Sequence, residues 1–241
     1  MASTQTQPAV FQRQGFRWDA QGAYLFDIDG TLLRCRDRIH VDSFFSSVRT
    51  VLGRELVLDG VVLSGNTDPG ILRDAFRAAK LDDALWQPHM ENILQQIRDD
   101  VAARRASFKI DKMPGVDQVL HHLHGKGATL GLATGNLESI GWLKVEFLGL
   151  RPWFALGGFS DRCIARADLI AEAARQARAL AGPQSTVCVV GDTPADIAAA
   201  RANGLSTIAV ATGNYSFDQL MEHQPEACAA NLLALFETAD A

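Results

Sequence analysis

The sequence predicts an α/β fold in which a Rossmann-like, doubly wound parallel sheet carries an inserted helical domain. Strands and helices alternate through the second half of the chain, which implies parallel pairing with right-handed crossovers. Within the strand expected at 186–190, residues 187–190 are all apolar, as is typical of a strand buried on both faces. A long helical stretch separates these elements from an earlier strand at 23–27. That stretch is therefore interpreted as an insertion after the first strand.

The expected domain boundaries follow from these patterns. Residues 1–21 show no clear periodicity and form an N-terminal extension. Residues 22–37 and 113–241 make up the α/β core, and residues 38–112 form the helical cap. A lid of this size would close over a site in the core and exclude bulk water.

Within the cap, apolar side chains recur at helical spacing over 43–52. Asp68 and Pro69 suit the N-cap and the first position of a second helix. A third, long helix is expected over 84–104. The stretch 56–63 is the one part of the cap whose pattern admits a strand.

In the second half of the chain, predicted helices alternate with predicted strands. Each helix is recognised by its apolar spacing or its end signals, and each strand by an apolar run. The helices are expected at 116–124, 139–148, 167–180 and 195–203, and the strands at 128–133, 154–156, 186–190 and 207–210.

Composition narrows the function classes. The chain has 241 residues, 47% of them hydrophobic, and a formal net charge of −5. Its basic patches are short, so it lacks the electrostatic footprint of a nucleic-acid-binding protein. No apolar run approaches the roughly 20 residues of a membrane span, and the first residues carry no signal-peptide pattern. We therefore expect a cytoplasmic protein without nucleic-acid or membrane partners; the oligomeric state stays open.

Asp27 and Asp29 end the first strand and are the strongest functional signal. Two carboxylates so close together cost stability unless a cation or an unusual protonation state balances them. One of them can attack a substrate while the other handles a proton. The alternative is a hairpin turn, because Asp-Gly is a common turn pair. Residues 32–40 do not alternate as a partner strand should, which favours the catalytic interpretation.

Two later strands also end in polar residues. Thr134 and Asn136 follow one of them, and Asp192 follows the other, with Asp196 one helical turn further on. Ligands bind beyond the carboxyl ends of parallel strands, so these groups are expected to share one site. Taken singly, each could instead be a turn or a helix cap.

These residues resemble three ordered motifs of the haloacid dehalogenase superfamily. The branch they resemble is that of phosphoglycolate-phosphatase-like hydrolases with a helical cap. The stretch Gly65-Asn66-Thr67-Asp68 also resembles part of those caps. The motifs are Asp27-Ile28-Asp29-Gly30-Thr31, Thr134-Gly135-Asn136 and Gly191-Asp192-Thr193-Pro194-Ala195-Asp196.

The resemblance implies a Mg²⁺-dependent phosphatase. Asp27 would attack phosphorus and form an aspartyl-phosphate. Asp29 would protonate the leaving oxygen and later activate water, while its backbone carbonyl binds Mg²⁺. Asp192 would bind Mg²⁺ directly, with Asp196 supporting the metal site. Clustered carboxylates suit Mg²⁺, which prefers a few carboxylate oxygens plus water.

The resemblance also implies phosphate-binding residues. Thr134 would bind phosphate through its hydroxyl, helped by backbone amides at Gly135 and Asn136. Gly30, in the turn after the first strand, is also expected to contact the phosphate. The family's usual lysine before the fourth motif is missing. Arg166 is the preferred substitute because it immediately precedes a helix, and Arg162 is the alternative. A guanidinium can hold both phosphate and a carboxylate, although its geometry differs from that of lysine.

The leading hypothesis is hydrolysis of a small phosphorylated metabolite. A phosphomutase on the same core remains open, as does a non-enzymatic binding or regulatory protein on an inherited scaffold. A dehalogenase would not need Asp29 or Asp192, and a phosphonatase would require a cap lysine, which this cap largely lacks. The candidates for contacting the leaving group are Arg34, Arg38, Thr67 and Asp68.

Overall fold

The computed structural model describes residues 10–238 and has the predicted α/β architecture. Its main sheet has seven strands in the order β1-β9-β8-β7-β2-β5-β6. All neighbouring strands pair in parallel except β1, which runs antiparallel to β9. The strands are β1 (Val10–Gln12), β2 (Ala23–Phe26), β3 (Leu33–Cys35), β4 (Ile110–Lys112), β5 (Thr129–Ala133), β6 (Leu156–Gly158), β7 (Val187–Gly191), β8 (Ser206–Val210) and β9 (Ala227–Ala229).

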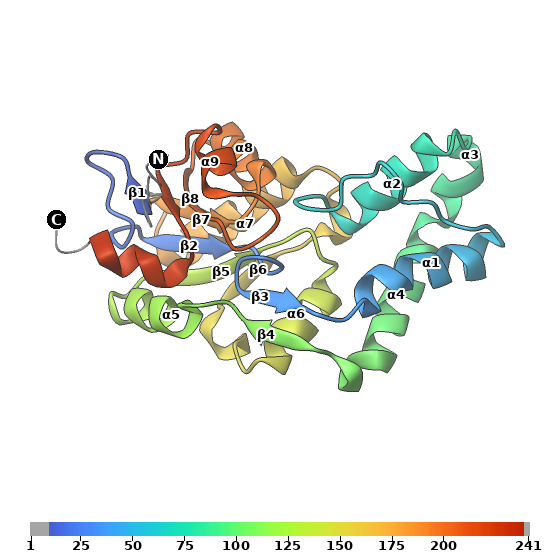
Figure 1. The fold of residues 1–241 in the computed structure, drawn as a ribbon, viewed down its shortest axis with the longest axis horizontal. Helices are drawn as coiled ribbons and strands as arrows, with labels where there is room; N and C mark the ends of the chain where they lie inside the picture. The colour runs from blue at the N-terminus through green and yellow to red at the C-terminus, as the bar shows by residue number, and fades with distance from the viewer. Residues whose placement is uncertain (1–9, 239–241) are drawn as a thin grey trace, which may run out of the picture.

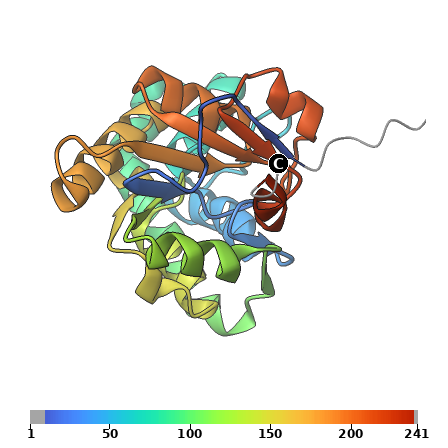
Figure 2. The same ribbon diagram turned by 90° about the vertical axis from the view of Figure 1, so that its left-hand side faces the viewer.

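Helices cover both faces of this sheet, as a doubly wound fold requires (Figure 2). Alternate residues of β2 show the two-sided burial directly. Tyr24 and Phe26 belong to one hydrophobic cluster, whereas Ala23 and Leu25 belong to a second cluster beneath α7. The α-helices are α1 (Ile39–Leu52), α2 (Asp68–Ala78), α3 (Asp83–Trp86), α4 (Met90–Arg104), α5 (Val116–Gly125), α6 (Glu138–Phe147), α7 (Arg166–Ala181), α8 (Pro194–Ala202) and α9 (Phe217–Met221).

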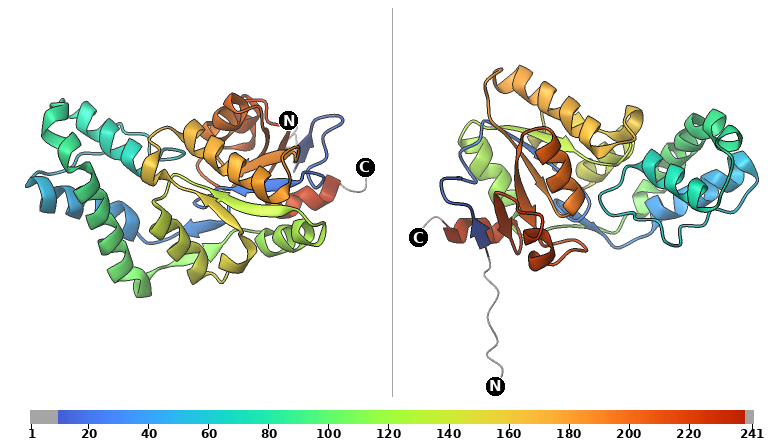
Figure 3. Two further views of the ribbon diagram at one scale, coloured as in Figure 1. Left: turned by 180° about the vertical axis from the view of Figure 1, so that it is seen from behind. Right: turned by 90° about the horizontal axis from the view of Figure 1, so that it is seen from above.

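Helices α1 to α4 form a second body at one end of the sheet (Figures 1 and 3). Its centre is the packing of α1 along α4. The chain leaves the core through β3 and returns through β4, and these two strands pair antiparallel with each other. This ribbon holds the helical body over the carboxyl ends of the sheet strands.

Several element boundaries differ from the sequence-based expectations. Residues 56–63 form no strand. The helix expected at 84–104 is interrupted by a 3-10 turn at Gln87–His89, because Pro88 lacks the backbone N–H that a continuous helix needs. Thr67, rather than Asp68, caps α2, since its hydroxyl accepts a hydrogen bond from the Gly70 amide at 3.1 Å.

Four short strands were also missed: β3 and β4 of the connecting ribbon, and β1 and β9 of the main sheet. The last strand was expected at 207–210, but β9 follows it and pairs with β8 in parallel. β1, from the predicted N-terminal extension, then pairs with β9. Three-residue strands carry too little alternation to stand out in a sequence. Among the described residues, no helix combines the length and the apolar composition that a membrane crossing requires.

Candidate active site

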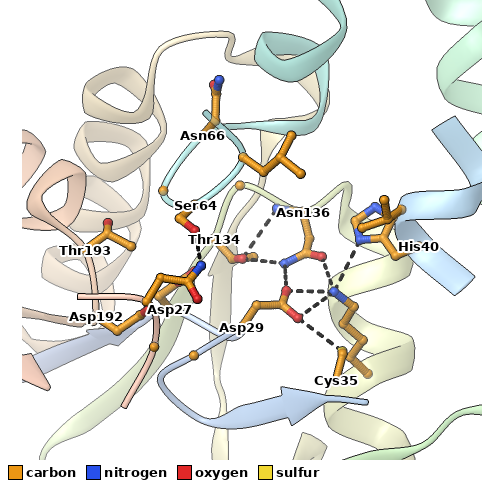
Figure 4. Close-up of a pocket in the computed structure, with 18 of the residues that line it drawn as sticks. Asp27, Asp29, Cys35, His40, Ser64, Asn66, Thr134, Asn136, Asp192 and Thr193 are labelled. Carbon is orange, nitrogen blue, oxygen red and sulfur yellow. Dashed lines mark hydrogen bonds and ion pairs between the residues drawn. The ribbon is translucent and has the colours of Figure 1, made fainter. Parts of the chain in front are cut away.

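Three adjacent strands bring the predicted polar residues to one place. In β2, Phe26 pairs with Leu132 of β5 on one side and with Val190 of β7 on the other. The residues that follow these strands therefore meet at the same sheet edge, as parallel register requires. Asp27, Thr134 and Asp192 line one cavity of about 460 Å³ beneath the cap (Figure 4).

Asp27, Asp192 and Asp196 form a buried carboxylate cluster. Each offers an oxygen within 4.8 Å of the others, and none of the three residues is more than 5% exposed. Burial raises the pKa values of Asp27 and Asp192, and the neighbouring carboxylates add to the rise. Charge crowding of this kind calls for cations, and a set of hard oxygen donors suits a divalent ion such as Mg²⁺. The cluster therefore fits a metal site.

Arg166 is one of the cations at this cluster. Its Nη2 lies 3.1 Å from Asp27 Oδ1 and 2.6 Å from Asp196 Oδ1, and its Nε donates to the same Asp196 oxygen at 2.9 Å. The guanidinium is buried at the first position of α7. Arg162, the alternative from the sequence, is exposed and does not line the cavity.

Asp196 is fully occupied by protein groups. Besides Arg166, it accepts hydrogen bonds from the backbone amide and the hydroxyl of Thr193, which caps α8. Asp192 differs, because among the described residues only the Thr31 hydroxyl donates to its side chain, at 3.1 Å. Asp192 therefore keeps more oxygen capacity for an ion than Asp196, which acts on the site through Arg166.

Gly30 permits the close approach of Asp192. It adopts φ +87°, in the region that favours glycine, and it lines the cavity. A Cβ built on this residue would collide with the Asp192 carboxylate. Asp29 and Gly30 thus form a turn, but this turn lies at the carboxylate site and does not connect two strands of the main sheet.

Lys144 is a site residue that the sequence reasoning missed. It lies on α6 with only 2% of its surface exposed. Its Nζ donates to both carboxylate oxygens of Asp29, at 2.7 and 2.9 Å, and to Oδ1 of Asn136 at 2.8 Å. Burial opposes ionisation of Asp29, but the Lys144 ammonium and the Asn136 amide outweigh it and lower the pKa of Asp29 to about 2.

A sequence signal for Lys144 existed. Leu137, Ile140 and Leu148 are apolar, and they lie seven residues before, four residues before and four residues after it. Lys144 therefore shares the apolar face of its helix. A charged side chain on such a face needs a buried partner, which here is the acidic site.

The turn after β5 connects the phosphate-binding candidates. The Asn136 side-chain amide donates to Asp29 Oδ2 at 2.8 Å and to the Thr134 hydroxyl at 2.7 Å. Thr134, Gly135 and Asn136 all line the cavity. This short segment therefore lies at the cavity beside the carboxylates.

The cap closes directly onto this turn. The Asp68 backbone amide donates to the Gly135 carbonyl at 2.8 Å, and the Asp68 carboxylate accepts from the Leu137 amide at 2.9 Å. His40 Nε2 lies 3.1 Å from the same carboxylate oxygen. A Cβ on Gly135 would collide with the carbonyl oxygen of Asn66 in the cap, so this close approach requires glycine.

The four leaving-group candidates fall in different places. Asp68 and Arg34 line the cavity. Thr67 does not line it, because its hydroxyl caps α2 and donates to the Ile164 carbonyl at 2.7 Å. Arg38 pairs with Asp42 on the surface and also lies outside the cavity lining. The predictions for Thr67 and Arg38 are therefore wrong.

Comparison with known proteins identifies the family. The family model of haloacid dehalogenase-like hydrolases matches residues 22–204. The chain belongs to this family. It is therefore a hydrolase enzyme, and the resemblance drawn from the three motifs is confirmed.

Its relatives include phosphatases. The phosphoglycolate phosphatase of Chromobacterium violaceum is 28% identical over 198 residues, which span 79% of this chain and 85% of the relative. A solved structure described as a predicted phosphoglycolate phosphatase from Haemophilus somnus 129pt has a TM-score of 0.65 at 17% identity, covering 91% of this chain and 98% of that one. A CbbY variant from Rhodobacter sphaeroides in complex with xylulose-(1,5)bisphosphate has a TM-score of 0.69 at 19% identity, covering 88% and 95%. At such identities the structural matches establish the shared fold.

Proposed function

We propose that this enzyme is a Mg²⁺-dependent phosphatase that hydrolyses a small phosphomonoester through an aspartyl-phosphate on Asp27. The observation that carries the proposal is that Asp27 belongs to the carboxylate cluster and also contacts Arg166, in a cavity beneath the cap. Phosphoryl transfer depends chiefly on positioning and on neutralising negative charge. This cavity supplies both.

In the first half-reaction, a carboxylate oxygen of Asp27 attacks phosphorus and the bond to the leaving oxygen breaks. Arg166 neutralises charge on Asp27, and Thr134 with the amides of Gly135 and Asn136 binds the phosphoryl oxygens. The leaving oxygen takes its proton from Asp29. An approaching phosphate dianion raises the pKa of that carboxyl, because like charges disfavour its ionised form.

In the second half-reaction, a water molecule attacks the aspartyl-phosphate and frees Asp27. The proton of that water passes to Asp29. The ion pair with Lys144 keeps Asp29 ionised and therefore ready to accept it. Free phosphate then leaves with the enzyme unchanged.

Mg²⁺ belongs to this proposal as the cation of the carboxylate cluster. Asp27, Asp192 and the backbone carbonyl of Asp29 would hold it, while Asp196 supports the site through Arg166. When bound, the ion offsets the charge that the carboxylates and the phosphate would otherwise bring together.

We also propose that residues 38–112 act as a lid over the core formed by 22–37 and 113–241. The hydrogen bonds from Asp68 to Gly135 and Leu137 are the contacts that would break when the lid opens. The cavity volume suits a small metabolite rather than a protein or nucleic acid. The expectation of a cytoplasmic enzyme stays part of this proposal.

The decisive test is phosphate release from p-nitrophenyl phosphate and from a panel of phosphorylated metabolites with Mg²⁺. Asp27→Asn should lower kcat at least about 10⁴-fold, because the nucleophile is lost while the shape is kept. Release of an isomerised sugar phosphate instead of free phosphate would identify a phosphomutase. No turnover at any Mg²⁺ concentration would support a binding protein.

A further inference from the structure

We propose that the natural substrate is a phosphomonoester whose leaving group is uncharged and largely apolar, rather than a small carboxylic acid such as glycolate. This inference rests on the proposed phosphatase function and names the substrate class of the same cavity. Two independent features of the cavity support it: the apolar side chains that the cap adds to its lining, and the engagement of the buried cations by protein groups.

Eight apolar side chains line the cavity and form its apolar wall, and all of them come from the cap and its connecting ribbon. Cap helices, the loop before α2 and the return through β4 each contribute hydrophobic side chains. Five of the eight contributors are buried, two are half-buried and Leu63 is exposed, so most of these side chains are held in place by packing. They are Val41, Phe44, Leu58, Leu63, Ile71, Phe108, Ile110 and Met113. A leaving group that reaches this wall gains from removing apolar surface from water.

The buried cations of the cavity are engaged by protein groups. Arg166 binds Asp27 and Asp196, and its Nη1 donates to the Gly65 carbonyl at 3.3 Å. Lys144 uses its donors on Asp29, Asn136 and His40, the last at 3.3 Å from Nζ to Nδ1. Lys144 therefore has no free N–H, and Arg166 keeps at most one, on Nη1, to offer a second anionic group.

The remaining cation in the lining is Arg34, which is exposed at the rim and donates to the Thr212 carbonyl at 3.5 Å. Carboxylates outnumber these cations among the lining residues, since Asp37 and Asp68 join Asp27, Asp29 and Asp192. A leaving group with its own carboxylate would bury that charge against an apolar wall and beside other carboxylates. Such burial is costly without a partner.

The test uses three phosphate esters of primary alcohols, so that the bond broken is of one class. They are 2-phenylethyl phosphate, 2-hydroxyethyl phosphate and 2-phosphoglycolate, and kcat/KM is measured for each from released phosphate with Mg²⁺. We expect 2-phenylethyl phosphate to exceed 2-phosphoglycolate at least about tenfold, which corresponds to about 1.4 kcal/mol. 2-Hydroxyethyl phosphate should lie between them.

Neighbouring residues in one loop provide a matched pair of variants. Leu63 lines the cavity, whereas Val62 is 63% exposed and lies outside the lining. Leu63→Asn should reduce the preference for 2-phenylethyl phosphate several-fold, and Val62→Asn should leave it unchanged. The readout is the ratio of kcat/KM values, so a general loss of folded enzyme does not imitate the effect.

The outcomes separate this inference from the phosphatase proposal. If phosphate is released but 2-phosphoglycolate is the best of the three esters, the phosphatase stands and the apolar leaving group is wrong. An equal change of the ratio in both variants would also overturn the apolar wall. If no ester is hydrolysed, p-nitrophenyl phosphate included, the phosphatase proposal fails and this inference fails with it.

Discussion

Asp27 and Asp29 lie two residues apart, yet they occupy different electrostatic environments. Asp27 faces Arg166 and two other buried carboxylates, and its pKa is raised. The Asp29 side chain is 40% exposed to the cavity, and Lys144 lowers its pKa to about 2. β2 ends at Phe26, so the chain has left the strand before Asp29, and the two side chains are not held on one face of the sheet as i and i+2 in a strand would be. One acidic motif thus yields two chemically distinct groups, an arrangement that suits one nucleophile and one proton carrier.

The cations of the two environments differ as well. Arg166 spans Asp27 and Asp196 with a planar fork, while Lys144 places one ammonium against the Asp29 carboxylate. Because Arg166 touches the proposed nucleophile and Lys144 touches the proposed acid and base, removing each cation should damage a different part of the reaction.

The largest effect is expected for Arg166→Ala. This change removes the positive charge beside Asp27 and leaves the Asp196 carboxylate buried without its partner, so kcat should fall by about 10²- to 10³-fold. Arg166→Lys keeps the charge and should recover part of the loss. The measurement is phosphate release from p-nitrophenyl phosphate, with circular dichroism melting to confirm folding. Arg162→Ala, on the exposed neighbour, is the matched control; a comparable loss there would exclude the special role of Arg166.

The next effect concerns Lys144. Lys144→Met keeps the length of the side chain but removes the cation that keeps Asp29 ionised, so the step in which Asp29 accepts the proton of water should slow. We expect kcat to fall by about 10²-fold for an alkyl phosphate and for p-nitrophenyl phosphate alike, because both pass through the same aspartyl-phosphate. A fast burst of about one p-nitrophenol per enzyme should precede the slow turnover. Lys109→Met, on an exposed lysine, is the control. A loss of kcat without that burst would mean that Lys144 only supports packing.

The carboxylate cluster predicts an effect of pH on metal binding. Asp27 and Asp192 have raised pKa values, and that of Asp192 rises from the usual 3.8 to about 8. Between pH 3.8 and about 8, the folded enzyme therefore binds more protons at these carboxylates than the unfolded chain does. Without Mg²⁺ its stability should fall as pH rises through this window. Mg²⁺ replaces those protons and should therefore bind more tightly at high pH.

Thermal melting measures this linkage. At about 100 times its Kd, Mg²⁺ stabilises by about 2.7 kcal/mol, which for this chain length is an increase in Tm of roughly 5–10 °C. We expect the full increase near pH 8 and a smaller one near pH 5.5. Asp192→Asn should abolish it. An increase that is independent of pH, or that persists in this variant, would place the metal elsewhere.

The sequence located the Asp27 side of the site better than the Asp29 side. Asp27, Thr134 and Asp192 follow strands, and parallel register alone brings strand ends together. Arg166 was also accessible, because it begins the helix that packs beside those strands. These positions depend on local patterns and on one topological rule.

The positions of Lys144 and His40 in the site depend on tertiary packing, which the local sequence pattern does not specify. Lys144 reaches Asp29 only because α6 turns its apolar face toward the site, and His40 arrives from the cap. The same limit explains the wrong prediction for Thr67. Its hydroxyl accepts a hydrogen bond from the Gly70 amide in α2 and donates one to the Ile164 carbonyl of the core. How two bodies close on each other is set by tertiary packing, which overrides local propensity.

The smallest predicted effect tests whether the cap reaches the Asp29 side through His40. This residue contacts Asp68 through Nε2 and Lys144 through Nδ1, and its ring stacks on that of Phe44 with the ring centroids 5.4 Å apart. His40→Phe keeps the stacking and removes both polar contacts. Losing hydrogen bonds of ordinary net strength should cost about 2- to 10-fold in kcat/KM. His89→Phe, at an exposed cap position, is the control. If His40 links cap closure to Asp29, kcat should fall together with a rise in KM; a change in KM alone would confine its role to holding the cap closed.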